Sequence, residues 1–406
     1  MIAAAVVTHR PPQLGNHSSG MGMAGYHGSV GCCRVGRALS DGTLASRLGK
    51  PDRQRLWRRA PGIHFRDETT QRPLRFSSYP NLVVGGGSGI SSSGASSKSS
   101  YTPNATGTAP ATWASSHHPS LGYVAYLATG RWYFMEETQF VATLNYLKNT
   151  DTQRLQSQGV FQSAAGANTT RGAAWAIRSL AQAACATPDD DALRGEFLAS
   201  LQANVDWNHA RYVAQSNNPF GWVVPYSDYT GVGDGVYVEA AWMQDFYTAA
   251  FGYAKALRPA ISEASSQRLS EFFAWKARSI VGRLGGAALT EYLYADAAQY
   301  TIAVAASDTP DFVSGTGPWH ADWGAIYVAT LKTPNPGSAP GLRGGNFPEA
   351  SSYWGNLQPA IAYAVQHAVP GAAQAYQRMI GAPNWNQLRA GFNASPVWSV
   401  RPIIEP

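Results

Sequence analysis

The stretch HHPSLGYVAYLATGRWYFMEETQFVATLNYLKN, residues 117–149, contains two helical segments separated by Gly130. A proline at position 119 suits the first helical position, and a glycine is a common stop signal. Apolar residues in the second segment recur every three or four positions, at Phe134, Phe140, Val141 and Leu144. The spacing therefore predicts helices over 119–129 and 131–149, joined as a hairpin.

The same pattern recurs along the chain. It predicts further pairs over 171–186 and 191–213, over 236–257 and 262–284, and over 348–368 and 371–380. Residues 287–331 are less regular, and the alternating TEYLYADAAQYTIAVAA (290–306) fits either a strand or a helix. Long loops rich in glycine and aromatics separate the pairs, as in residues 217–235. Consecutive hairpins of this kind favour a mainly α fold, an α/α toroid with an incomplete or complete set of six hairpins.

The segment before residue 113 has a different character. Residues 1–64 mix Gly, Ser, Arg and His without a period, which predicts a disordered basic tail. Residues 65–112 combine short strand-like pieces with the linker GGGSGISSSGASSKSS, and we expect a β-like arm followed by a flexible Gly/Ser-rich linker. Residues 113–406 are assigned to the toroid domain.

Charge and composition limit the classes of partner and cofactor. The formal net charge is +6, but residues 1–75 hold 12 of the 31 Lys and Arg and only 4 of the 25 Asp and Glu. The rest is close to neutral, so we expect no nucleic-acid partner. No stretch reaches the length of a membrane span. The three cysteines lack metal-ligand spacing, and no P-loop or H-E-x-x-H motif is present, so no metal or cofactor is expected.

The opening stretch carries the first candidate site. On a helix, Glu137 shares the apolar face with Phe140, Val141 and Leu144, whereas Glu136 points about 100° away. A carboxylate on an apolar face needs a partner or has a raised pKa, so Glu137 is either catalytic or part of a structural ion pair. His117 and His118 lie on the loop before the first helix, where either is a candidate acid or base or a solvent-exposed loop residue.

The second candidate lies in NTTRGAAWAIR, residues 168–178. Asn168 or one of the two threonines is expected to cap the helix, which places Arg171 in its first turn and Trp175 one turn later. An arginine beside the free N–H groups of a helix start suits a carboxylate ligand. The alternative is an arginine that joins hairpins and a tryptophan that packs.

A third group combines carboxylates with aromatic side chains, the combination that sugar binding uses. Continuous helix over 236–257 would place Trp242 between Glu239 and Asp245 around the circumference. The motif GPWHADWG, 317–324, repeats this chemistry. Core packing explains any single tryptophan equally well. The candidates are Tyr229, Glu239 and Asp245 for catalysis, and Trp132, Tyr226, Tyr237, Trp242, Trp319, His320 and Trp323 for substrate binding.

The motifs HHPSLGYVAYLATGRWYFMEE and TRGAAWAIRSLAQAACATPDDD resemble the C-terminal α/α toroid of exo-rhamnogalacturonan lyase-like bacterial proteins, over about residues 113–390. The resemblance implies an acidic polysaccharide or oligosaccharide substrate, with lyase chemistry slightly ahead of hydrolysis. In a lyase, Arg171 would neutralise a uronate carboxylate, and His117, His118 or Tyr229 would remove the α-proton. A hydrolase would pair Glu137 with Glu239 or Asp245. A non-catalytic glycan-binding or structural module is the remaining alternative.

Overall fold

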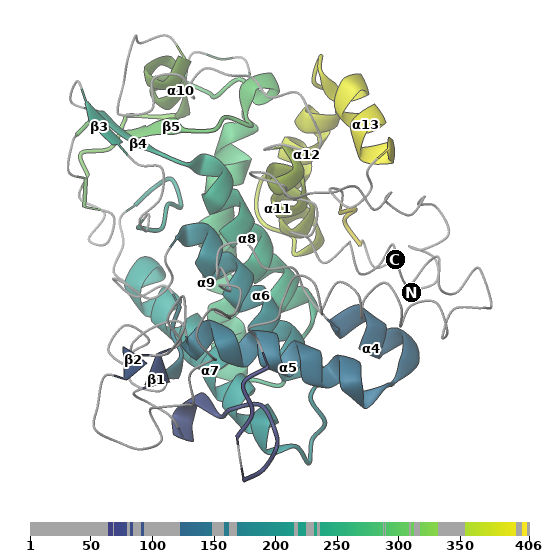
Figure 1. Ribbon diagram of the computed structural model, residues 1–406. Helices are drawn as coiled ribbons and strands as arrows, with labels where there is room; N and C mark the ends of the chain where they lie inside the picture. Colours follow the sequence, from purple (N-terminus) through teal and green to yellow (C-terminus); the bar gives the residue numbers. More distant parts are fainter. Residues whose placement is uncertain are drawn as a thin grey trace, which may run out of the picture.

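The computed structural model describes residues 64–67, 69–78, 82–83, 91–92, 122–147, 158–161, 169–214, 218–224, 231–233, 236–286, 288, 290–307, 310–311, 317–331, 354–394 and 400–403. This part of the chain is mainly helical, as the periodicity predicts (Figure 1). Its α-helices are α4 Tyr123–Thr129, α5 Trp132–Leu147, α6 Thr170–Ala186, α7 Ala192–Asn208, α8 Ala241–Ala256, α9 Glu263–Arg283, α10 Trp323–Leu331, α11 Trp354–Gln366, α12 Ala372–Ile380 and α13 Trp385–Ala394.

Side-chain caps set the starts of three helices. Thr169 accepts a hydrogen bond from the Gly172 N–H at the start of α6. Asp191 caps α7 and Ser262 caps α9 in the same way. Each cap satisfies a backbone donor that the helix itself leaves without a partner, so the chain enters the helix at that residue.

The helices form two layers. α6 and α8 are neighbours and run parallel. Three contacts along their length join residues that are each 71 positions apart: Arg171 with Trp242, Trp175 with Phe246, and Gln182 with Tyr253. On its other side α8 packs against α11. The inner layer is therefore α6, α8 and α11.

The outer layer runs in the opposite direction. α7 and α9 are parallel to each other, joined by hydrogen bonds between residues about 60 positions apart: Gln202 with Ser262, Asp206 with Ser265, and His209 with Glu271. α8 and α9 are antiparallel, because the early Asp245 meets the late Arg283 while Phe251 meets Phe272. Helical hairpins thus stack side by side, with an aromatic core between the layers.

The strands are short and antiparallel. β3 Gly231–Gly233, β4 Val236–Glu239 and β5 Ile302–Ala305 form a three-stranded sheet in the order β3-β4-β5, and β1 Leu82–Val83 pairs with β2 Ser91–Ser92. The three-stranded sheet and α10 lie at the end of α8 where that helix begins (Figure 1). Side chains from both of these elements therefore reach the first turns of α8.

The structure corrects the expected helix over 236–257. Residues 236–239 form β4, and Ala240, with ψ 89°, ends the strand before α8 begins. Glu239 is consequently not on the helix, and the expected arrangement of Trp242 between Glu239 and Asp245 around one circumference is wrong. Val236, Tyr237 and Val238 have high strand propensity, which competes with the helical spacing in this segment.

Other differences are smaller. Residues 290–306 contain a 3₁₀ turn, Tyr294–Asp296, followed by β5, so the alternating pattern forms a strand only at its end. A π-helical turn, His209–Val213, finishes the segment after α7. Helix α13 was not expected from the sequence. Residues 1–63 lie outside the described residues, as do 348–353 of the expected helix before α11.

Candidate functional site

Arg171 lies in the first turn of α6, where the sequence predicts it. Its side chain is buried, with 5% of the residue exposed, and its guanidinium carbon lies 5.2 Å from the centre of the Trp242 ring in the first turn of α8. Among the described residues, its Nε atom has no hydrogen-bond partner. The parallel packing of α6 and α8 brings these two residues together at the N-terminal ends of both helices, where Arg171 Nε is a donor without a partner among the described residues.

Trp175 lies one turn further along α6 and is also buried. Its ring meets the edge of Phe246 at 5.1 Å, and the Arg178 guanidinium lies 4.2 Å from the ring centre. Aromatic edges and cations both prefer such positions on a π system. The arrangement is that of an interhelical core, which is the packing alternative stated for this tryptophan.

Four charged residues lie inside the molecule between α8, α9 and β4: Glu239, Asp245, Lys276 and Arg283, here called the buried charge cluster. Each is at most 1% exposed. The guanidinium nitrogen Nη2 of Arg283 donates hydrogen bonds to both carboxylate oxygens of Asp245, at 2.6 and 2.5 Å. The Glu239 carboxylate lies 3.5 Å from the Gln244 amide nitrogen. Groups of this kind are rarely buried without partners, and Arg283 and Asp245 partner each other as an ion pair.

Burial and charge act in opposite directions on the pKa values in this cluster. Burial lowers the pKa of Lys276 to about 7, against the opposing effects of Asp245 and Glu239. Burial also raises the pKa of Asp245, and Arg283 opposes that change. Lys276 thus titrates close to neutral pH, unlike an exposed lysine.

The motif GPWHADWG, residues 317–324, contacts the buried charge cluster through tryptophans. Trp323 packs against Phe220 at 4.9 Å and lies 6.1 Å from Trp222, while Trp319 approaches Phe220 at 6.5 Å. The Lys276 ammonium lies 5.7 Å, and the Arg283 guanidinium 5.8 Å, from the centre of the Trp222 ring.

Trp222 therefore connects GPWHADWG to the buried charges. His320, in the same motif, is half-buried, and burial lowers its pKa. Tyr237, on β4, is half-buried and packs at the edge of the same group of aromatics.

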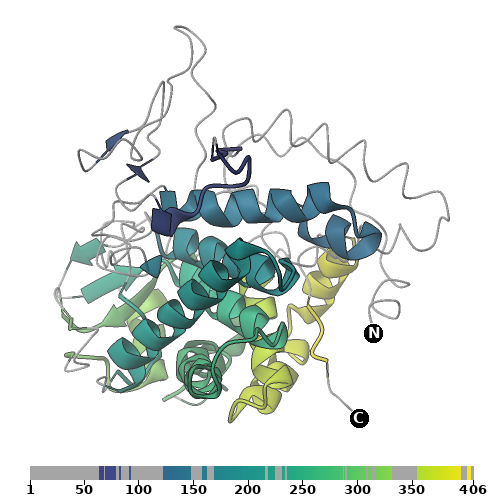
Figure 2. The ribbon, with the colours of Figure 1, turned by 90° about the horizontal axis from the view of Figure 1, so that it is seen from below.

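Glu137 belongs to a different place in the structure. Both of its carboxylate oxygens lie 2.9 Å from His64 Nε2. His64 belongs to residues 64–67 and 69–78, here called the N-terminal arm, which lies on α5 (Figure 2). The His64 ring also meets the edge of Phe140 at 5.0 Å.

Glu136 is buried as well, with 9% of the residue exposed, which corrects the expectation that Glu137 alone faces the interior. Arg66 of the N-terminal arm forms two hydrogen bonds with its carboxylate, at 2.9 and 2.6 Å. Arg72 approaches it at 3.5 Å and donates to Asp191 at 2.6 Å. The arm covers a face of α5, so both neighbouring glutamates are partnered by residues that precede residue 113 in the chain.

The remaining predicted residues are four outside the described part of the chain and Trp132. His117, His118, Tyr226 and Tyr229 lie outside the described residues. Trp132 is 49% exposed, and the Arg72 guanidinium lies 4.4 Å from its ring centre. It is therefore part of the arm contact on α5.

The sequence reasoning missed Lys276, Arg283, Trp222 and His64. A signal existed for the first two. Lys276 and Arg283 continue the helical spacing of the buried Leu269, Phe273 and Ile280, so two cations occupy an apolar face. Trp222 and His64 reach their partners through loops, and no short-range pattern predicts such contacts.

No family model, curated protein or solved structure matches the chain in the comparisons with known proteins. Within the described residues, no group of three or more His, Cys, Asp or Glu is placed to hold a metal ion. None of the helices in that same part is both long and apolar enough to cross a membrane.

Proposed function

We propose that this chain is an α/α toroid protein that degrades an acidic polysaccharide by β-elimination. The observation that carries the proposal is Arg171, buried in the first turn of α6 above Trp242 with its Nε unused among the described residues. The parallel inner helices and the opposite direction of the outer ones support the toroid, because hairpins stacked in one orientation curve into rings or solenoids.

Arg171 supplies the electrostatic part of the reaction. Elimination from a uronate needs neutralisation of the carboxylate, since negative charge develops beside it when the α-proton leaves. A planar guanidinium binds a carboxylate through two parallel hydrogen bonds, and burial strengthens them. His117, His118 or Tyr229 then removes the α-proton as the base, the glycosidic C–O bond breaks as the double bond forms, and a tyrosine protonates the leaving oxygen.

Elimination is favoured over hydrolysis by the surroundings of the carboxylates. A glycoside hydrolase needs one carboxyl free to donate a proton and a second free to act on the sugar or on water. Asp245 is occupied by Arg283, and Glu137 by His64. The proposed pairs of catalytic carboxylates therefore meet competing partners, whereas Arg171 keeps an unused donor.

The test is a screen of the purified protein against rhamnogalacturonan, polygalacturonate and alginate, with galactan as the neutral polymer. Ultraviolet absorbance of the unsaturated product and reducing ends are followed in parallel. Absorbance with reducing ends on an acidic polymer is the expected result. Reducing ends alone would refute elimination in favour of hydrolysis, and silence in both from a folded, helical protein would refute catalysis.

Two variants separate catalysis from packing. Arg171→Met keeps an unbranched apolar stem and removes the guanidinium charge, and the expected loss is about a hundredfold or more in kcat/KM. Arg178→Met is the matched control, because Arg178 is also buried on the same helix, at 2% exposed against 5% for Arg171, and also stacks on a tryptophan. Equal losses in both variants would assign Arg171 to packing.

A further inference from the structure

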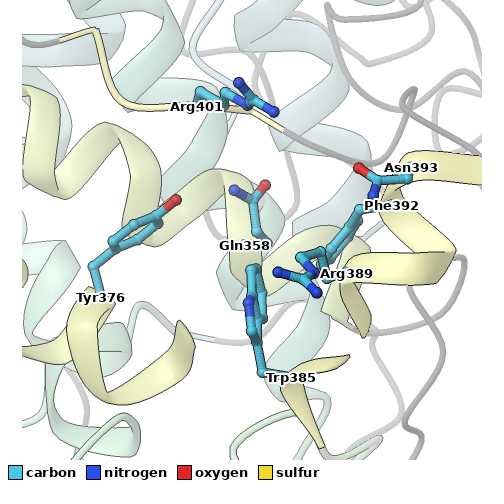
Figure 3. A pocket seen from close by; sticks show the side chains of 7 residues that line it. All are labelled: Gln358, Tyr376, Trp385, Arg389, Phe392, Asn393 and Arg401. Atoms are coloured by element: carbon cyan, nitrogen blue, oxygen red, sulfur yellow. The ribbon is translucent and has the colours of Figure 1, made fainter. Parts of the chain in front are cut away.

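A pocket of about 360 Å³ opens between α11, α12, α13 and the segment 400–403 (Figure 3). Its volume falls in the range of roughly 300–1,000 Å³ that is usual for small-molecule sites. It takes no part in the arginine and tryptophan network at the starts of α6 and α8. The lining side chains are those of Gln358, Tyr376, Trp385, Arg389, Phe392, Asn393 and Arg401.

The aromatic part of the lining comes from two helices. Trp385 and Phe392, both on α13, lie 6.2 Å apart with their ring planes inclined by 45°. Tyr376, on α12, stands on the opposite side of the pocket (Figure 3). Trp385 and Tyr376 are half-buried, so each presents part of a ring to the opening. Half-exposed rings of this kind suit the apolar face of a sugar.

The C-terminal segment is held over the pocket by a specific contact. Gln358 accepts a hydrogen bond from the Val400 N–H at 2.8 Å, and its amide donates back to the Val400 carbonyl. Gln358 is 3% exposed, so this pairing is shielded from water. It places Arg401 at the mouth, where its charge acts on the Tyr376 hydroxyl.

The charged side chains among the described lining residues of the pocket have one sign. Residues 350–404 contain no Asp and no Glu, although the chain has 25 of them, and they include Arg378, Arg389 and Arg401. Arg378 is used structurally, because its Nε donates to the Leu284 carbonyl at 2.6 Å. Arg389 and Arg401 are exposed at the pocket, and none of the described residues that line it carries a carboxylate. Two arginines, with no acid among the described lining residues, favour an anionic ligand.

We propose that this pocket binds one acidic sugar residue, with its carboxylate between Arg389 and Arg401 and its ring against Trp385. The requirement for an anion attached to a ring follows from the lining alone. The choice of a sugar acid rests on the proposed function, in which the pocket would hold a stretch of acidic polysaccharide away from the reacting bond.

The test uses three probes that separate these features. D-glucuronate carries both a ring and a carboxylate, D-glucose lacks the carboxylate, and acetate lacks the ring. Saturation-transfer NMR on the full chain detects weak binding and shows which ligand protons contact the protein. We expect a signal from the ring protons of glucuronate, binding of glucose about tenfold weaker, and no displacement of glucuronate by an equal concentration of acetate.

The double variant Arg389→Gln/Arg401→Gln locates the binding. Both arginines are exposed, so the variant is expected to fold, and circular dichroism checks this. Glucuronate binding should weaken about tenfold or more. Arg278→Gln is the control, because Arg278 is an exposed arginine on α9 that does not line the pocket.

Unchanged binding in the double variant, equal binding of glucose, or displacement by acetate would each overturn the proposal. The two proposals fail separately. A protein that binds glucuronate here but cleaves no polysaccharide refutes the reaction and keeps the pocket. Cleavage together with unchanged binding in the double variant refutes the pocket alone.

Discussion

Lys276 makes folding stability depend on pH in a window where most proteins show little change. The folded protein holds its ammonium fully buried, and the pKa falls from the ordinary 10.5 to about 7. Between these two values the unfolded chain binds a proton that the folded protein does not bind. Stability therefore rises with pH from about 7 to about 10, and the destabilising effect is fully present below pH 7.

The magnitude follows from the two pKa values. Each pH unit inside the window contributes up to about 1.36 kcal/mol to the free energy of unfolding. Close to pH 7 the folded lysine is still half protonated, so the expected gain from pH 7 to pH 9 is about 2 kcal/mol. Cys185 acts in the opposite direction above pH 9, because burial raises its pKa to about 11.

The assay is urea unfolding, followed by tryptophan fluorescence and circular dichroism, at pH 7, 8 and 9. Lys276→Met removes the proton site while keeping an unbranched side chain of similar length, so its curve should lack the gain. The double variant Glu239→Gln/Lys276→Met is the control. The single change leaves the buried Glu239 carboxylate without the charge of Lys276 nearby, and the double variant removes that carboxylate as well. Parallel pH dependence of the natural protein and both variants would refute the assignment to Lys276.

Three further predictions concern the pairs and turns that hold the fold. Asp245→Asn leaves a buried arginine without its charged partner and should lower the free energy of unfolding by about 3–5 kcal/mol, measured in urea; a loss below about 1 kcal/mol would contradict a buried ion pair. Glu136→Gln weakens the anchor of the N-terminal arm, so trypsin should cleave the arm faster than in the natural protein while the helical core stays intact; equal cleavage rates would argue against this anchor. Gly122 has φ 79°, and a Cβ there would collide with the Phe134 carbonyl oxygen. Gly130 also has a positive φ, 65°, but nothing lies within 4 Å of a Cβ there. Gly122→Ala should therefore lower the melting temperature far more than Gly130→Ala.

The helices and most of their ends could be predicted because their determinants are local. Thr169, Asp191 and Ser262 cap helices through bonds to backbone groups two or three residues away, and Gly130 ends α4 in a left-handed conformation. Apolar spacing within one or two turns is enough to select the buried face. The strand before α8 was missed because four residues carry too little periodic signal to separate a strand from a helix.

The candidate site was predicted only in part. Arg171 was selected from its place at an expected helix start, and Trp242 from the carboxylates expected beside it. Their contact depends on the parallel register of α6 and α8. The helical spacing could have predicted that Lys276 and Arg283 lie on an apolar helix face. The pairing of Arg283 with Asp245 could not be predicted, because an ion pair between helices is set by how the helices pack.

The sequence by itself determined a mainly helical chain of successive hairpins, since a helix is specified by hydrogen bonds and side-chain spacing within a few residues. Only the tertiary structure decided the partners of the charged groups. His64 and Arg66 reach Glu137 and Glu136 from about 70 positions away, and Arg283 reaches Asp245 from 38. Such pairs form because folding buries both charges at the same place, and the residues next to either charge in the sequence do not predict its partner.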